Sequence, residues 1–180
     1  MDIDLKYNVI YADPPWTFKT YSNKGKDRSP EKHYSVMSFK DICNMPVGNI
    51  ARDNSVLLMW TIDPLLHKAF EVIKAWGFTY KTVAFTWAKL NKTKPGFFTG
   101  LGYWTRGNPE MCLLATKGKP KRLSKSVPQL VVDRRREHSR KPDVIYTHIE
   151  NLLEGPYIEL FARQQREGWD SWGNEVNKWN

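Results

Sequence analysis

The order of elements along the sequence predicts an α/β fold, with a largely parallel sheet flanked by helices. Residues 55–61, SVLLMWT, form a continuous apolar run typical of a strand buried on both faces. Residues 64–77 repeat apolar side chains at helical spacing, with Pro64 in the first turn and Gly77 at the exit. Strands that alternate with helices favour a parallel sheet with helices on its faces. The length fits a single domain over residues 1–180.

The other elements follow in order. A buried strand is predicted at residues 7–12, and Ser38 is placed to cap a short helix that Pro46 interrupts. Alternating or short apolar runs predict further strands at residues 78–89, 110–118, 129–134 and 157–163, and periodicity predicts a helix at 141–155. Long polar loops are expected at residues 17–37 and 90–108. Ligands bind where the carboxyl ends of parallel strands meet, so we expect some of these strand ends to share one crevice.

The composition narrows the range of partners. The chain carries 28 basic and 19 acidic residues, a net charge of +9. On charge alone, a polyanion partner, with nucleic acid as the leading candidate, and a basic enzyme that binds no polyanion are equally compatible with this sequence. Cys43 and Cys112 are the only cysteines, and the four histidines show no metal-ligand spacing, so neither a disulfide framework nor a metal site is predicted. Without a signal peptide or a membrane-spanning run, we expect a cytoplasmic protein with no membrane partner.

The segment YADPPW, residues 11–16, combines features that a simple strand exit does not need. Pro14 and Pro15 cannot extend a sheet, and their fixed φ holds the backbone in one pose. Asp13 and the Pro14 carbonyl offer two acceptors, and Trp16 offers a stacking surface. Such a set fits an exocyclic amino group on a base. That nitrogen is a poor nucleophile until its hydrogens are held, so this arrangement predicts transition-state electrostatics rather than covalent catalysis.

These residues and those that follow resemble the MT-A70 family of adenine N6-methyltransferases. DPPW is a form of the motif [D/N/S]PP[Y/F/W] of amino-group methyltransferases. The resemblance continues through HYSVMS, GYWTRGNPEMCLLATKG, SRKPDVIYTHIENL and YIELFAR…GWDSWGNEV, from about Tyr7 to Val176. It implies a Rossmann-like fold that uses S-adenosylmethionine, with circularly permuted motif order: the catalytic motif comes first and the cofactor strand last.

The resemblance also implies roles for single residues. The catalytic motif is Asp13, Pro14, Pro15 and Trp16. The acceptor side is Tyr34, Trp104 and Glu110, where Glu110 either orients a base or makes a structural ion pair. The cofactor is held by Asp13, Lys141, Arg163, Gln165, Asn174 and Glu175, with Lys141 on the methionine carboxylate. Gln165, Arg166 and Glu175 differ from the residues that the family places there.

The basic residues recur in the loops and predict a phosphate track along the mouth of the site. They fall in four groups, at residues 19–32, 89–94, 117–125 and 134–141. A target adenine must be flipped out or single-stranded, and the candidates to stack on it are Trp16, Tyr34, Phe97, Phe98, Tyr103 and Trp104.

DNA is favoured as substrate because no RNA-binding module is evident, and RNA is the alternative. Two other readings stay open: an inactive nucleic-acid-binding module, or a methyltransferase acting on cytosine N4 or a protein amide. A monomer, a homodimer and a pair with a homologous partner are all compatible with the sequence.

Overall fold

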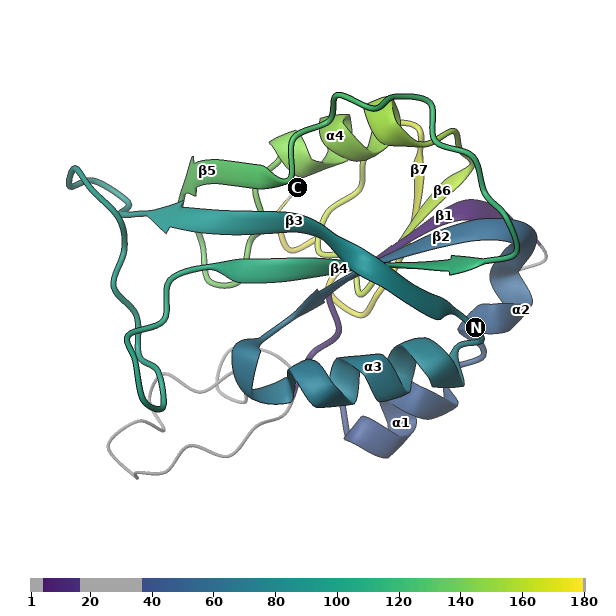
Figure 1. The fold of residues 1–180 in the computed structure, drawn as a ribbon, viewed down its shortest axis with the longest axis horizontal. Helices are drawn as coiled ribbons and strands as arrows, with labels where there is room; N and C mark the ends of the chain where they lie inside the picture. The colour runs from purple at the N-terminus through teal and green to yellow at the C-terminus, as the bar shows by residue number, and fades with distance from the viewer. Residues whose placement is uncertain (1–4, 17–36, 180) are drawn as a thin grey trace.

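The computed structural model describes residues 5–16 and 37–179, which form a seven-stranded sheet flanked by helices (Figure 1). The strand order across the sheet is β5-β3-β4-β2-β1-β6-β7. The strands are β1 (Tyr7–Ala12), β2 (Ala51–Thr61), β3 (Thr79–Leu90), β4 (Glu110–Lys117), β5 (Leu130–Arg134), β6 (Tyr157–Leu160) and β7 (Trp169–Trp172).

Strand β4 is antiparallel to the other strands of this sheet. It pairs antiparallel with both β2 and β3, whereas the pairs β1–β2, β1–β6, β3–β5 and β6–β7 are parallel. The predicted largely parallel sheet is therefore confirmed. The beginning of β4 consequently lies at the same edge as the carboxyl ends of the parallel strands, and its end lies at the opposite edge.

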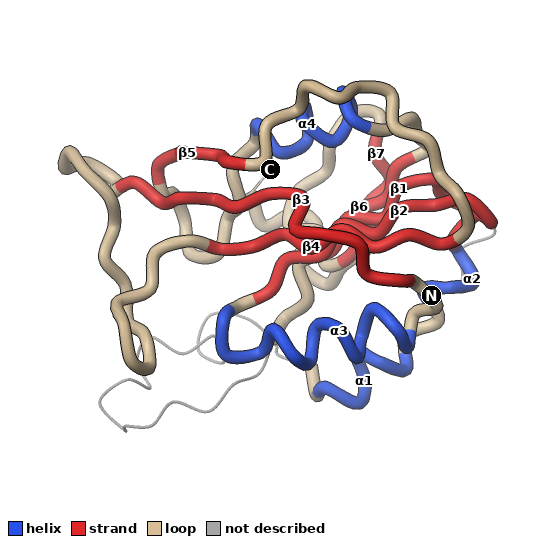
Figure 2. Tube along the Cα trace, viewed as in Figure 1, coloured by secondary structure: helices blue, strands red, loops and turns tan. Residues whose placement is uncertain are grey.

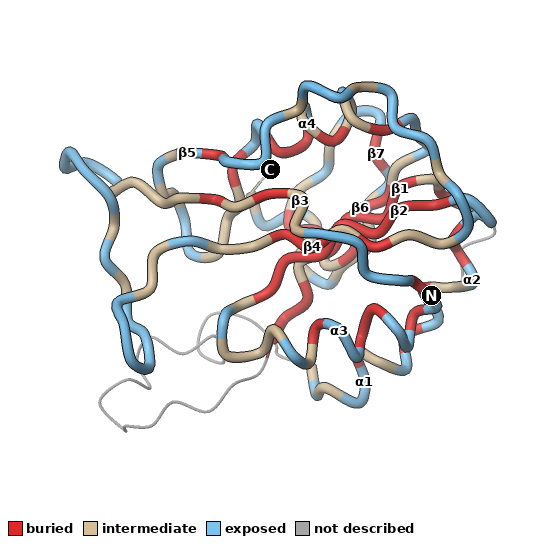
Figure 3. Tube along the Cα trace, viewed as in Figure 1, coloured by how far each residue is buried: buried red, intermediate tan, exposed pale blue. Residues whose placement is uncertain are grey.

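Helices cover both faces of the sheet (Figure 2). Helices α1 (Phe39–Asn44), α2 (Val47–Ile50) and α3 (Leu66–Ala75), with the 3-10 turn η3 (Asp63–Leu65), pack on one face, and α4 (Val144–Leu152) packs on the other. Successive residues of β1 point to opposite faces, so Ile10 joins the first core and Tyr11 the second. The central strands are buried along most of their length (Figure 3).

Most predicted elements are present, with shifted bounds. The Ser38 side chain accepts a hydrogen bond from the Asp41 N–H and caps α1 as predicted. The helix predicted from residue 141 begins only at Val144, and β6 ends at Leu160 because Phe161 adopts a left-handed φ of 63°. Helix α2 and strand β7 were not predicted, since each has only four residues, too few for a periodic pattern to show. Among the described residues, no helix is long and apolar enough to cross a membrane.

Candidate active site

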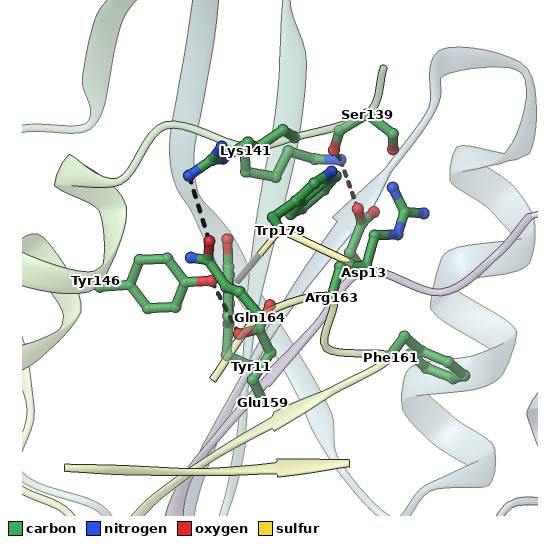
Figure 4. A pocket seen from close by; sticks show the side chains of 11 residues that line it. Tyr11, Asp13, Ser139, Lys141, Tyr146, Glu159, Phe161, Arg163, Gln164 and Trp179 are labelled. Carbon is green, nitrogen blue, oxygen red and sulfur yellow. Dashed lines mark hydrogen bonds and ion pairs between the residues drawn. The ribbon is translucent and has the colours of Figure 1, made fainter. Parts of the chain in front are cut away.

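Charged residues from four distant segments meet at the carboxyl edge of the sheet. Asp13 follows β1, Glu110 begins β4, Lys141 precedes α4 and Lys89 lies near the end of β3. The Lys141 Nζ lies 2.7 Å from the Asp13 Oδ2 and 3.3 Å from the Glu110 Oε2 (Figure 4 shows the contact with Asp13). The other Glu110 oxygen, Oε1, lies 2.9 Å from the Lys89 Nζ. The expected convergence of strand ends thus produces a chain of alternating charges.

This arrangement fixes the charge of its members. Burial alone would raise the pKa of Glu110, but attraction by Lys141 and Lys89 outweighs it and lowers the pKa to about 2. Burial alone would lower the pKa of Lys141, but Asp13 and Glu110 raise it above its usual value. At neutral pH both Glu110 and Lys141 therefore stay ionised. A carboxylate with so low a pKa is a poor proton acceptor.

The rest of the DPPW motif is built into the core. Pro14, Pro15 and Trp16 are buried, and the Trp16 indole N–H donates to the Trp60 carbonyl at 3.1 Å. Trp16 was a candidate to stack on the base, but in this structure its ring is 4% exposed and packs in the first core, so it presents no free face. The Pro14 carbonyl accepts the Trp16 backbone N–H at 2.8 Å. A carbonyl oxygen has two lone pairs, so it keeps one for another donor.

A small cavity opens beside Asp13, on the side of β6 and α4. The residues lining it are Tyr11, Asp13, Ser139, Arg140, Lys141, Tyr146, Glu159, Phe161, Arg163, Gln164 and Trp179 (Figure 4). Its volume is about 20 Å³, enough for one water molecule. Glu159 is buried here and accepts the Tyr146 hydroxyl at 2.8 Å. Burial is the main cause that raises the pKa of Glu159 to about 7, and Asp13 adds to it while the Tyr146 bond opposes it.

The predicted cofactor residues divide into two sets. Arg163 is buried in the cavity wall and pairs with Glu175, with 3.4 Å between Nε and Oε2. Gln165 is exposed and donates to Asn177, and Asn174 is exposed two residues after the end of β7. None of these three residues, Gln165, Asn174 and Glu175, lines the cavity, although each lies within five residues of one that does.

Several cavity residues had no sequence prediction as site residues. Trp179 lies four residues beyond Glu175, with its ring centroid 5.4 Å from the Arg163 guanidinium and 5.3 Å from that of Arg140. Its backbone N–H donates to the Arg163 carbonyl. No pattern near the chain end signals this return to the site. Tyr146 could have been found, because it lies five residues after Lys141, on the buried face of α4 with Ile145 and Ile149.

The acceptor-side predictions have mixed outcomes. Tyr34 lies outside the described residues. Trp104 is 100% exposed in the segment between β3 and β4. Glu110 takes part in the ion pairs with Lys141 and Lys89, the structural alternative of the sequence analysis.

The predicted phosphate track needs one correction. The residues at 89–94 and 134–141 lie at the carboxyl edge, but the group that begins at Lys117 does not. Lys117 pairs with Ser55 near the start of β2, and the Lys119 backbone N–H donates to the Asn54 side chain. Because β4 is antiparallel, its end reaches the edge opposite Asp13. The group at 19–32 lies outside the described residues.

Comparison with known proteins identifies the family of this fold and site. The MT-A70 family model matches residues 7–175. The chain belongs to the MT-A70 family. Members of this adenine N6-methyltransferase family use S-adenosylmethionine.

Two groups of relatives resemble this MT-A70 chain. The type II methyltransferase M.MunI of Mycoplasma sp is 35% identical over 190 residues, which cover 95% of this chain and 78% of that protein. The Arabidopsis thaliana N(6)-adenosine-methyltransferase MT-A70-like protein is 31% identical over 182 residues. The human N(6)-adenosine-methyltransferase catalytic subunit METTL3 is 29% identical over 186 residues. This chain spans 25% of the Arabidopsis protein and 30% of the human one.

The residues of this MT-A70 site suit S-adenosylmethionine chemically. Its amino-acid end carries a carboxylate, and the cavity offers the cations Lys141 and Arg163. Its ribose carries hydroxyl groups, and Glu175, just after β7, offers a carboxylate acceptor. The aromatic rings of Phe161 and Trp179 line the same cavity, and an aromatic ring suits a purine face.

Proposed function

We propose that this chain transfers a methyl group from S-adenosylmethionine to the N6 amino group of adenine in DNA. The observation that carries the proposal is the Asp13 carboxylate at the carboxyl edge of the sheet, held at 2.7 Å by Lys141. It lies within the DPPW motif and beside a small cavity whose lining residues suit the cofactor chemically.

Asp13 and Pro14 are proposed to hold the amino group. One Asp13 oxygen contacts Lys141, which leaves the other to accept an amino hydrogen. The Pro14 carbonyl has one lone pair left for the second hydrogen. Both acceptors stabilise the positive charge that develops on the nitrogen as the methyl group arrives. When bound, the cofactor would supply that methyl group on a sulfonium and leave as the neutral thioether, and the nitrogen would release one of its hydrogens as a proton to solvent.

Lys141 and Glu110 are proposed as positioning residues. Lys141 stays an ammonium at neutral pH, so it cannot remove a proton from the base. Its place between Asp13 and Glu110 fixes the orientation of Asp13 instead. Glu110, with a pKa of about 2, anchors Lys141 from the other side. In this proposal the Lys141 ammonium contacts the cofactor carboxylate while it keeps its ion pair with Asp13 or with Glu110.

The DNA substrate is proposed from the relatives and the charge. The type II methyltransferase name of M.MunI points to DNA, and this relative is matched over 78% of its length. The eukaryotic relatives are named for adenosine, and they match over 25 to 30% of theirs. The net charge of +9 suits either polyanion. RNA therefore belongs in the same test.

The experiment is methyl transfer from labelled S-adenosylmethionine to single-stranded DNA, duplex DNA and RNA, followed by digestion and identification of the nucleoside. We expect N6-methyladenine, highest on DNA, and at least a 100-fold loss in Asp13→Asn. Asp53→Asn, an exposed carboxylate at the start of β2, is the matched control and should keep activity. A protein that neither binds the cofactor nor transfers a methyl group would refute the proposal and favour the inactive binding module.

A further inference from the structure

The segment between β3 and β4, residues 91–109, projects beyond the sheet next to the active site (Figure 1). We call it the arm. Its outer part exposes large apolar side chains: Phe97 is 62% exposed, Leu101 63%, Tyr103 52% and Trp104 100%. A fully exposed tryptophan side chain adds nothing to the free energy of folding, because none of its apolar surface is removed from water. Such a group of exposed apolar side chains marks an interaction surface.

The arm is held in shape by its own contacts. The Gly100 N–H donates to the Gly107 carbonyl at 2.7 Å and joins the two sides of the outer loop. At Gly102 a Cβ atom would lie 1.9 Å from the Thr105 carbonyl oxygen, so only glycine fits the tip. The exposure of Trp104 is therefore built into the turn.

The base of the arm, where Phe98 and Asn108 lie (the root), contacts residues of the active site. The Asn108 side chain exchanges two hydrogen bonds with the backbone of Lys89, at 2.9 and 3.0 Å. The Lys89 Nζ in turn contacts Glu110. Phe98 is covered by the Arg135 guanidinium, 3.3 Å from its ring centroid, so this ring is part of the root. The outer aromatic residues are thus separate from those that fix the arm.

The charge of the arm indicates its partner. Residues 91–109 contain Lys92, Lys94 and Arg106 and no acidic residue. All three cations are exposed. Exposed cations interleaved with aromatic rings bind single-stranded nucleic acid, through phosphate contacts and base stacking. A second copy of this chain would bring like charges together, which disfavours self-association through the arm.

We propose that the arm binds the nucleic-acid strand beside the target base, with Trp104 stacked on an unpaired neighbouring base and the three cations on phosphates. The inference rests on the proposed nucleic-acid substrate and names a second point of contact outside the catalytic motif. It also selects Trp104 over Trp16, whose ring is buried in the core, and over Phe98, whose ring is covered by Arg135.

The test measures binding of a fluorescein-labelled single-stranded DNA of about 20 nucleotides with one adenine, by anisotropy. A set of such strands carries a single abasic site, placed at a different position around that adenine in each strand. We expect one position at which the abasic site weakens wild-type binding roughly tenfold. Trp104→Ala should bind the intact strand roughly tenfold more weakly and no longer respond to that position, whereas Trp104→Phe should respond. Leu123→Ala, which alters a side chain 61% exposed elsewhere, should match the wild type.

Salt dependence tests the cations separately. The triple variant Lys92→Gln, Lys94→Gln, Arg106→Gln should reduce the slope of log affinity against log salt by about 2, at about 0.7 per phosphate contact. An unchanged slope, or Trp104→Ala binding as tightly as the wild type, would overturn the inference even if methyl transfer is found. So would sedimentation showing a Trp104-dependent dimer with unchanged DNA affinity. Coupling of Trp104 to one abasic position without methyl transfer would support the arm and refute the proposed function.

Discussion

Replacing Glu159 by glutamine should change how the stability of this protein depends on pH. Glu159 is buried beside the cavity, and its folded-state pKa is about 7 against an ordinary value of 4.5. The folded state therefore holds this proton more tightly than the unfolded state. The contribution of the protonated carboxyl is fully present below pH 4.5 and is lost as the pH rises towards 7. The full loss is roughly 3 kcal/mol, at about 1.36 kcal/mol per pH unit.

Glutamine mimics the protonated carboxyl and keeps an acceptor for the Tyr146 hydroxyl. Glu159→Gln should thus gain roughly 2 to 3 kcal/mol of unfolding free energy over the wild type between pH 5 and pH 8. The assay is urea unfolding at several pH values, read as the difference between the two proteins. Glu167→Gln, at an exposed carboxylate of the same region, removes the same charge and should show no such gain. A Glu159→Gln curve parallel to the wild type would refute the reasoning.

Other side chains give sharper tests of the site. Lys141→Met removes the cation between Asp13 and Glu110. The pKa of Glu110 should rise from about 2, measured by NMR titration, and methyl transfer should fall at least 100-fold; an unmoved pKa would contradict the ion-pair account. Trp16→Ala should cost about 3 to 5 kcal/mol in urea unfolding, because the ring is buried; a loss under 1 kcal/mol would contradict its place in the core. Trp179→Ala should weaken binding of S-adenosylmethionine roughly tenfold in isothermal titration, because its ring lines the cavity and suits a purine face; an unchanged affinity would contradict that role.

The sequence predicts the local features of this molecule well and its strand pairing poorly. Apolar runs located β1 and β2, and periodicity located α3, because each signal is carried by neighbouring residues. The direction of β4 depends on which strands it joins, and no residue within Glu110–Lys117 records that. Because the direction of β4 was not predicted, the basic group that begins at Lys117 was assigned to the wrong edge of the sheet. Likewise, Trp16 is a good stacking surface by residue type, and only the packing under β2 shows that its ring is buried.

The orientation of β4 decides whether the candidate site exists at all. An eight-residue strand is about 25 Å long, so a parallel β4 would place Glu110 that far from the edge where Asp13 lies. Lys141 would then face one carboxylate, and Lys89 would lose its partner in the site. The antiparallel pairing instead places Glu110 beside Lys141 and directs the chain before it, the arm, out past the same edge. The antiparallel strand β4 thus supplies both the anchor for the carboxylate that we propose as catalytic and the surface that we propose for the nucleic-acid strand.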